Sequence, residues 1–320
     1  MGLNYSPVAG SATQSKTNRL IKRIIKHKYL YLLILPGCLY YLIFKYLPMF
    51  GILIAFKDYK PSMGIVGFFT APWVGFKNFL IFFKSSYSTE IITNTLLISL
   101  YKIVFGFPAP IILALLLNEV NNKYYKKVLQ TVTYLPHFLS WVIVGGMMFE
   151  LLSTTSGSLN EIIKSLTGET INFLANPKLF RSVLVVSDIW KGVGWGSIIY
   201  LAALAGVSSE LYEAALIDGA NRFQKMIYIA LPSIVPAIIM VFLLRLGGIL
   251  DAGFEQIFIL YSPMVYNVSD IIDTYVYREG LVNARYGYST AVGLAKSAIA
   301  MILILTANKI IKKSGNNGII

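Results

Sequence analysis

The sequence has few charged residues, a single cysteine and two histidines. Asp, Glu, Lys and Arg make up 13% of the 320 residues, whereas soluble domains carry about 25%. Hydrophobic residues make up 56% of the chain, and its mean hydropathy is +0.65. This composition excludes an ordinary soluble domain and is typical of an integral membrane protein.

The chemistry-bearing residues that are present do not form a recognisable catalytic or metal motif. Cys38 has no partner for an intramolecular disulfide, and His27 and His137 stand apart from other metal-ligating residues. No Gly-x-x-x-x-Gly-Lys-Ser/Thr run occurs, so we expect no P-loop and no bound ATP. The sequence therefore predicts no catalytic residue, no metal and no cofactor in this chain, and a protein that is not an enzyme.

Long apolar runs dominate the sequence instead. A membrane-spanning helix needs about 20 mostly apolar residues. Six segments meet this requirement, at roughly 29–55, 94–118, 129–152, 181–206, 229–250 and 286–311. Because lipid offers no partner for free backbone groups, and the runs are too long for barrel strands, all six should be helical. The sequence predicts an all-α integral membrane protein with six transmembrane helices.

The basic residues predict how these helices are oriented, since cytoplasmic loops carry an excess of Lys and Arg. With the N-terminus inside, basic residues far outnumber acidic ones in the inner segments and only match them in the outer loops. Both termini are therefore predicted to be cytoplasmic, and the net charge of +13 reflects orientation rather than nucleic-acid binding. We divide the chain into a basic tail at 1–27, a six-span transmembrane domain at 28–313 and a short tail at 314–320.

The first predicted outer loop, at about 56–93, is rich in aromatic residues. An aromatic belt at the membrane–water interface is the favoured interpretation. A landing surface for an outside partner is the alternative.

One polar segment, at 207–232, is predicted to lie in the cytoplasm between two apolar spans. Ser208 or the next serine can cap a helix, and Gly219 accepts the left-handed backbone that ends one. Asn221 with Gln224 resembles a capping box for a second helix. The expected shape is a helix, a glycine turn and a helix, which together form an elbow. From shape alone, an amphipathic helix lying on the bilayer is the alternative.

The elbow also carries the spacing Glu-Ala-Ala, three residues, Gly, nine residues, Ile-x-Leu-Pro. This spacing is filled by Glu213, Ala214, Ala215, Gly219, Ile229, Leu231 and Pro232. It resembles the EAA motif of binding-protein-dependent ABC importer permeases. Further stretches at 46–51, 72–79, 106–110 and 134–138 resemble the carbohydrate branch of that family, its LplB-like and maltose-type permease subunits.

The resemblance implies a type I ABC importer permease (MetI-like) fold and a set of partners. These are a second, homologous permease subunit that completes a heterodimer, a cytoplasmic ABC ATPase dimer, an extracytoplasmic solute-binding lipoprotein and the lipid bilayer. Oligosaccharides or polysaccharide fragments would be the substrate, and ATP with Mg would bind the ATPase subunits. ATPase coupling would rest on Glu213, Ala214, Ala215, Asp218, Gly219 and Arg222. The expected location is the plasma membrane of a bacterium, and residue usage indicates a Gram-positive host.

Charged residues inside predicted spans are candidates for contacts with the substrate. Asp188, Lys191 and Trp195 share one face of the fourth span, where an aromatic ring offers a surface for sugar stacking. In maltose-type relatives the corresponding stretches line the sugar site. Matching them gives the substrate-binding candidates Asp188, Lys191, Gly192, Trp195, Arg245, Ile249 and Asp251.

Two interpretations of these charges stay open. Asp188 and Lys191 could neutralise each other as internal ion pairs that hold the helices together, which is the favoured alternative. An acidic or larger saccharide is conceivable if they contact the substrate. Lys102 is expected near a membrane interface.

The sequence as a whole predicts a permease subunit whose elbow couples ATP hydrolysis on partner chains to rocking of the spans. An ion-gradient-driven secondary transporter is one alternative, because charged residues inside spans are compatible with it. A membrane scaffold whose elbow recruits an ATPase is another. Sugar uptake and the neighbouring genes would distinguish the three.

Overall fold

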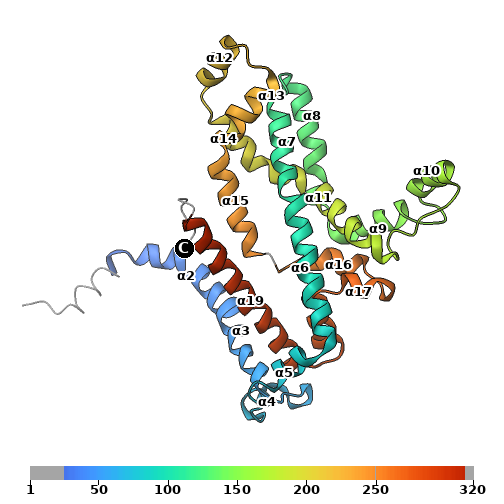
Figure 1. Ribbon diagram of the computed structural model, residues 1–320. Coiled ribbons are helices and arrows are strands. Elements are labelled where there is room, and N and C mark those ends of the chain that lie inside the picture. Colours follow the sequence, from blue (N-terminus) through green and yellow to red (C-terminus); the bar gives the residue numbers. More distant parts are fainter. Residues whose placement is uncertain (1–24, 249, 314–320) are drawn as a thin grey trace, which may run out of the picture. The chain divides into compact units, whose positions relative to one another are not determined.

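The computed structural model describes residues 25–248 and 250–313, and within these ranges it is built from helices without a strand (Figure 1). The chain forms two compact units, Met1–Leu53 and Ile54–Ile320. The all-α prediction is therefore confirmed for the described part of the chain. Each unit is described by itself below.

The first unit is an almost continuous apolar helix. It consists of α2 (Lys28–Tyr41), a π-helical turn η1 (Leu42–Tyr46), α3 (Leu47–Met49) and the start of η2 (Phe50–Phe56). Its large side chains are exposed along the whole length within the unit; Leu33, for example, is 79% exposed. A 29-residue helix with apolar side chains on every face is suited to lipid rather than water.

The second unit contains all the remaining described helices. Its first half comprises η3 (Pro61–Met63), α4 (Gly64–Thr70), α5 (Lys77–Lys84), α6 (Ser86–Gly106), α7 (Pro108–Asn118), α8 (Lys123–Tyr134), η4 (Leu135–Phe138), α9 (Trp141–Leu151) and α10 (Ser158–Thr167). Its second half comprises α11 (Pro177–Ala205), α12 (Ser209–Ile217), α13 (Arg222–Lys225), η5 (Met226–Ala230), α14 (Leu231–Ser233), α15 (Val235–Gly247), α16 (Phe254–Leu260), η6 (Pro263–Val265), α17 (Tyr266–Ser269), α18 (Ile272–Tyr277), η7 (Arg278–Val282) and α19 (Tyr286–Lys313).

The lengths and compositions of the described helices support between three and six membrane crossings. Three helices qualify directly: Lys28–Phe56, Ser86–Asn118 and Tyr286–Thr306. Three bent pairs qualify only if each pair is one span: Lys123–Phe138 with Trp141–Leu151, Pro177–Ala205 with Ser209–Ile217, and Arg222–Ser233 with Val235–Gly247.

The third predicted span, 129–152, is not a single straight helix. The segments before and after residues 139–140 meet at 102°. Ser140 adopts an extended backbone, and its hydroxyl accepts a hydrogen bond from the amide of Ile143 at 3.3 Å, so it caps α9 as a new helix. The bend leaves His137 and Trp141 on either side of a corner.

The central helix of the second unit is α11, whose two halves belong to two apolar clusters. Phe180 and Leu184 pack with residues of α6 and α16, including Ile98 and Ile257. Tyr200 and its neighbours pack with residues of α7 and with the segment that follows the elbow. One helix therefore connects the region around α16 to the region around the elbow.

A hydrogen bond to an ion pair attaches the segment 261–285 to the start of α6. Arg278 lies 2.5 Å from Asp270, which is fully buried, and the Tyr87 hydroxyl donates to the same carboxylate at 2.5 Å. A buried carboxylate with several donors is a rigid attachment rather than a free binding group.

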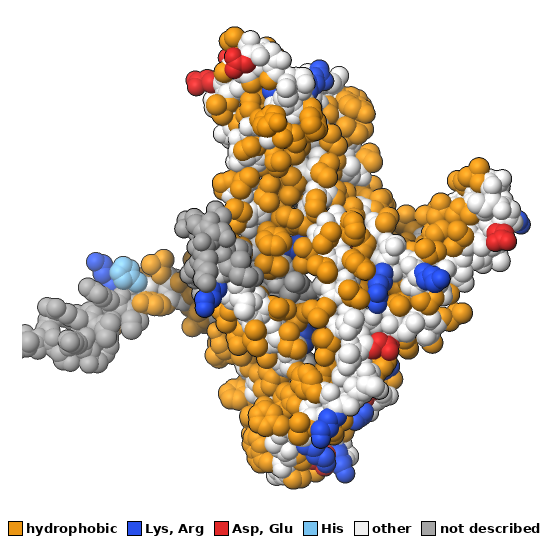
Figure 2. Space-filling model, in the orientation of Figure 1, with side chains coloured by type: hydrophobic (Ala, Val, Ile, Leu, Met, Phe, Trp, Pro, Cys, Tyr) orange, Lys and Arg blue, Asp and Glu red, His pale blue; other side chains and the backbone are white. Residues whose placement is uncertain are grey.

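Helices α12 and α13 lie at one end of the second unit, and α4 and α5 lie at the opposite end (Figure 1). On the face shown in Figure 2, hydrophobic side chains cover the sides of the long helices, whereas acidic side chains appear at the α12 end. Apolar sides between two polar ends are what a bilayer requires.

Candidate functional site

The elbow at 207–232 has the helix–turn–helix form that the sequence predicts. The Ser208 hydroxyl accepts from the amide of Glu210 at 3.2 Å and caps α12. Gly219 has a φ of 77° and ends that helix. Asn221 and Gln224 form the expected capping box, with reciprocal bonds of 2.8 and 2.9 Å. These local signals fix the elbow without any long-range contact.

The tip of the elbow presents side chains that no described residue of the second unit covers. Ile217 is 86% exposed and Phe223 is 67% exposed, at the end of α12 and the start of α13. Glu213, Asp218 and Arg222 are exposed as well, and none of them forms an ion pair with another described residue. Large apolar side chains beside free charges are typical of a surface that another protein covers.

Tyr212 attaches the elbow to the bundle. Its ring packs against the apolar cluster around Tyr200. Burial raises the pKa of the Tyr212 phenol, and the Glu119 carboxylate at the end of α7 raises it further. The Tyr212 ring thus joins α12 to an apolar cluster that contains residues of α7 and α11.

A cluster of charged residues lies between α6, α11 and α15. The Lys102 ammonium is 3.3 Å from Asp188 Oδ1 and donates to Gln256 Oε1 at 2.5 Å. Arg245 Nη2 is 3.8 Å from Asp188 Oδ2, and Arg245 Nη1 donates to the Gly106 carbonyl at 3.3 Å. Each oxygen of the Asp188 carboxylate thus faces a different cation.

Lys191 does not neutralise Asp188, so that prediction was wrong. The Lys191 ammonium donates to the His137 carbonyl at 2.8 Å and lies 5.6 Å from the centre of the Trp141 ring. The bend between α8 and α9 supplies both of these partners, whereas the Asp188 carboxylate is held by cations from α6 and α15. Among the described residues, Lys191 has no acidic partner.

The expectation for Lys102 was also wrong. Its side chain is only 9% exposed, and it lies in the interior because α11 and α16 bring polar partners to it. Gln256 is fully buried as well, and its amide donates to the Leu184 carbonyl and the Ser187 hydroxyl at 2.7 Å each. The Lys102 ammonium and both ends of the Gln256 amide therefore have polar partners, as a buried ammonium group requires.

The charged cluster borders a cavity of about 310 Å³, which we call the cation cavity. Its polar and aromatic lining includes His137, Trp141, Asp188, Lys191, Gly192 and Arg245. A Cβ at Gly192 would meet nothing within 4 Å, so this glycine leaves open space beside the charges. The structure therefore brings Asp188, Lys191, Gly192 and Arg245 together, as their candidate role requires.

The remaining substrate candidates lie elsewhere or outside the described residues. The Trp195 ring stacks on the His137 ring, with centroids 4.7 Å apart and planes 1° apart, so one face is already covered. Asp251 belongs to a different cluster, described next. Ile249 lies outside the described residues.

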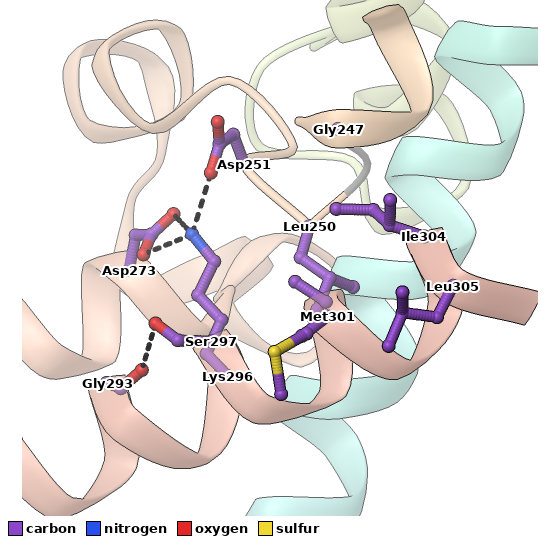
Figure 3. Close-up of a pocket in the computed structure, with 11 residues that line it drawn as sticks. Gly247, Leu250, Asp251, Asp273, Gly293, Lys296, Ser297, Met301, Ile304 and Leu305 are labelled. Carbon is purple, nitrogen blue, oxygen red and sulfur yellow. Dashed lines mark hydrogen bonds and ion pairs between the residues drawn. The ribbon is translucent and has the colours of Figure 1, made fainter. Parts of the chain in front are cut away.

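Asp251 and Asp273 share one lysine of α19 (Figure 3). The Lys296 ammonium donates to Asp251 at 2.9 Å and to the two oxygens of Asp273 at 2.8 and 2.7 Å. Burial raises the pKa of the Asp273 carboxyl, and the Lys296 ammonium opposes that effect. This cluster borders a cavity of about 560 Å³ whose other walls are mostly apolar.

A further cavity of about 770 Å³ lies beside this cluster, and we call it the acidic cavity. Asp251, Glu255 and Asp273 outnumber Lys296 there, while Phe254 and Tyr277 supply aromatic walls, and Trp141 lines both this cavity and the cation cavity. No group of His, Cys, Asp and Glu side chains among the described residues is arranged to hold a metal ion.

Sequence reasoning missed Lys102, Gln256, His137 and Trp141. For Lys102, the available signal was a lysine within an apolar run, because charged residues inside spans are functional candidates. Gln256 and Asp188 lie 154 and 86 residues away from Lys102, and no local pattern relates them.

Comparisons with known proteins agree with this geometry. Residues 106–313 match the family described as binding-protein-dependent transport system inner membrane component. The chain is 49% identical to Protein LplB of Bacillus subtilis (strain 168) over 294 residues, which cover 92% of each chain. It is 46% identical over 306 residues to the polygalacturonan/rhamnogalacturonan transport system permease protein YteP of the same organism, covering 96% of this chain and 94% of YteP.

Two solved structures resemble the chain closely. A chain of a bacterial ABC transporter involved in the import of the acidic polysaccharide alginate superposes with a TM-score of 0.85 at 42% identity, over 92% of this chain and 99% of that one. A chain of the bacterial alginate ABC transporter in complex with an alginate pentasaccharide-bound periplasmic protein gives a TM-score of 0.86 at 41% identity, over 94% and 100%.

Proposed function

Because the chain belongs to the family of binding-protein-dependent transport system inner membrane components, we propose that it is the permease subunit of an ATP-driven importer of acidic oligosaccharides. It is a transport subunit rather than an enzyme, since members of this family leave ATP hydrolysis to separate subunits. Its apolar helices place it in a membrane.

The elbow supports coupling to a cytoplasmic ATPase. Glu213, Asp218 and Arg222 are exposed and unpaired among the described residues, and Ile217 and Phe223 offer apolar contact area beside them. An ATPase groove with complementary charge would cover these side chains and move α12 when ATP closes the ATPase pair. Gly219 sets the angle between the two elbow helices, and Ala214 and Ala215 let a partner approach closely.

The charge of the cation cavity supports an acidic substrate, and this observation carries the proposal. Lys191 and Arg245 line this cavity together with the Asp188 carboxylate, and that carboxylate is already paired with Lys102 as well as with Arg245. Uncompensated cations inside a membrane protein are costly unless an anion joins them. The names of similar proteins agree, since they include an alginate importer and a permease for polygalacturonan and rhamnogalacturonan. Trp141 supplies a ring on which a sugar can stack.

The topology and partners complete the proposal. We infer six crossings, which three unbroken helices and three bent helix pairs among the described residues are compatible with, and the excess of basic residues in the inner segments supports cytoplasmic termini. A second, homologous permease would close the pathway, and a solute-binding lipoprotein would deliver the sugar from outside. The proposed location is the plasma membrane of a Gram-positive bacterium, as for the similar Bacillus subtilis proteins.

Uptake by the assembled transporter tests this function. Proteoliposomes containing this chain, its partner permease and the ATPase are supplied with the binding protein and radiolabelled trigalacturonate or its methyl ester. We expect ATP-dependent uptake of the acid and much less of the ester, and Glu213→Ala should abolish uptake while the complex stays assembled. Uptake driven by an ion gradient without ATP, or normal uptake by Glu213→Ala, would contradict the proposal.

A further inference from the structure

The Asp188 carboxylate is shared between two cations that come from different helices. Lys102 on α6 contacts Oδ1 at 3.3 Å, and Arg245 on α15 lies 3.8 Å from Oδ2. The carboxylate occupies the position that an anion bound between these helices would take. The protein therefore contains its own anion at a site that is otherwise cationic.

The two cations differ in how firmly they are held. The Lys102 side chain is 9% exposed and has a second, short bond to the fully buried Gln256. The Arg245 side chain is 36% exposed, its contact with Asp188 is long, and its other bond goes to the Gly106 carbonyl at 3.3 Å. Lys102 cannot give up its carboxylate without leaving a charge unpaired in the interior. Arg245 borders the cavity and is free to turn toward a ligand.

The second cation of the cavity, Lys191, has no acidic partner among the described residues. Its ammonium donates to the His137 carbonyl and lies over the face of the Trp141 ring. Arg245, Lys191 and Trp141 line the same cavity, where Gly192 leaves open space. A sugar carboxylate entering that space would find two cations, and a pyranose ring would find an aromatic face.

We propose that the Asp188 carboxylate occupies the place of the substrate's carboxylate until substrate binds. A uronate group of the sugar then forms an ion pair with Arg245 in place of Asp188, while Asp188 stays paired with Lys102. This rests on the proposed function, because it names how the same cavity distinguishes acidic from neutral sugars. A neutral sugar cannot displace Asp188 from Arg245, so it leaves the ion pair between α11 and α15 intact. The uronate opens that ion pair and frees α15, the helix that follows the elbow in the chain.

The exchange predicts opposite effects for the two partners of the ion pair. Asp188→Asn removes the internal competitor, and its amide oxygen still accepts a hydrogen bond from Lys102. The acid should then bind more tightly, by about tenfold if the displaced contact was worth about 1.4 kcal/mol. Arg245→Gln removes the group that is exchanged and leaves Lys191 as the cation of the cavity, so the preference for acid over ester should fall. Asp188→Glu keeps the carboxylate and should resemble the wild type.

Binding to the full permease–ATPase complex in lipid nanodiscs, without binding protein, tests the proposal. Dissociation constants are measured for trigalacturonate and for its methyl ester, which has the same rings and no charge. Glu161→Gln on α10 is the matched control, because it removes an exposed carboxylate that does not line the cavity. Size-exclusion profiles establish that each variant assembles.

The expected result is tighter binding of the acid alone by Asp188→Asn, with Glu161→Gln unchanged. Equal or weaker acid binding by Asp188→Asn, or an equal gain for the ester, overturns the exchange while leaving acid-specific uptake by the wild type intact. If the wild type and every variant bind acid and ester alike and the wild type also takes up both alike, the proposed substrate class fails, and the exchange fails with it.

Discussion

The turn of the elbow allows a backbone conformation to be tested apart from side-chain packing. Gly219 has a φ of 77°, and a Cβ placed on it would meet no atom within 4 Å. Gly219→Ala therefore adds strain without adding a collision. Gly219→Asn is the matched rescue, because asparagine adopts the left-handed region more readily than alanine. Gly146→Ala, in a helix where its Cβ would also meet nothing, is the control for glycine replacement itself.

The size of the effect follows from the backbone alone. A residue with a Cβ in the left-handed region costs about 1–2 kcal/mol. That cost lowers the population of the elbow's observed form by a factor of about 5–30, provided that no partner offsets it. Gly146→Ala carries no such cost and should be neutral or slightly stabilising.

Sugar-stimulated ATP hydrolysis by the reconstituted transporter measures this population, since the elbow is the proposed link to the ATPase. We expect stimulation to fall strongly in Gly219→Ala, to be largely restored in Gly219→Asn and to be unchanged in Gly146→Ala. Basal hydrolysis reports on the ATPase subunits themselves. Wild-type stimulation in Gly219→Ala, or equal losses in the alanine and asparagine variants, would refute the argument that the left-handed turn matters.

Three further predictions concern the bundle. Gly194→Val should prevent assembly, because its Cβ would lie 2.1 Å from the Thr133 carbonyl oxygen. Gly192→Ala, whose Cβ would meet nothing within 4 Å, should assemble. The yield of assembled complex on size exclusion distinguishes the two outcomes. Lys102→Met should destabilise the complex by about 3–5 kcal/mol, because it leaves Asp188 and Gln256 without their buried cation. An unchanged melting temperature relative to the exposed control Lys84→Met would contradict that burial argument. Asn160→Ala should open the segment between α9 and α11, because the buried Asn160 side chain forms hydrogen bonds with Leu152, Ser153 and Ile171 at 2.8–3.0 Å. Leaving a buried hydrogen-bonding group without its partner costs about 1–3 kcal/mol. Faster cleavage between residues 153 and 176 in limited proteolysis is expected, and an unchanged cleavage rate counts against it.

The elbow could be predicted from the sequence because each of its signals acts over a few residues. The Ser208 cap, the Gly219 turn and the Asn221 capping box all involve partners within three positions along the chain. Backbone preference and side-chain capping decide such features before any tertiary contact forms. The apolar runs were equally accessible, since length and composition alone identify helices able to span lipid.

The interior of the site could not be predicted in the same way. The bend at 139–140 interrupts a run that is mostly apolar, so hydropathy alone describes it as one span. Ser140 and the preceding proline were the available signals for a new helix start. The partners of Lys102 depend on which helices pack together. Spacing within α11 suggested Lys191 as the partner of Asp188, whereas the cations that pair with Asp188 come from α6 and α15.

The helix that carries Arg245 is also the one that follows the elbow, so the charged cluster includes a residue on the helix that the elbow would move. Residues Arg222–Ser233 and Val235–Gly247 meet at 60°, with a π-helical turn just before the bend. A π-helical turn inside a helix is frequently found at functional sites. Of the two ion pairs of Asp188, the one to Lys102 joins α11 to α6, and only the one to Arg245 reaches α15. Movement of the elbow relative to α11 therefore acts on the Arg245 contact first, which is the longer of the two and the one that borders the cavity.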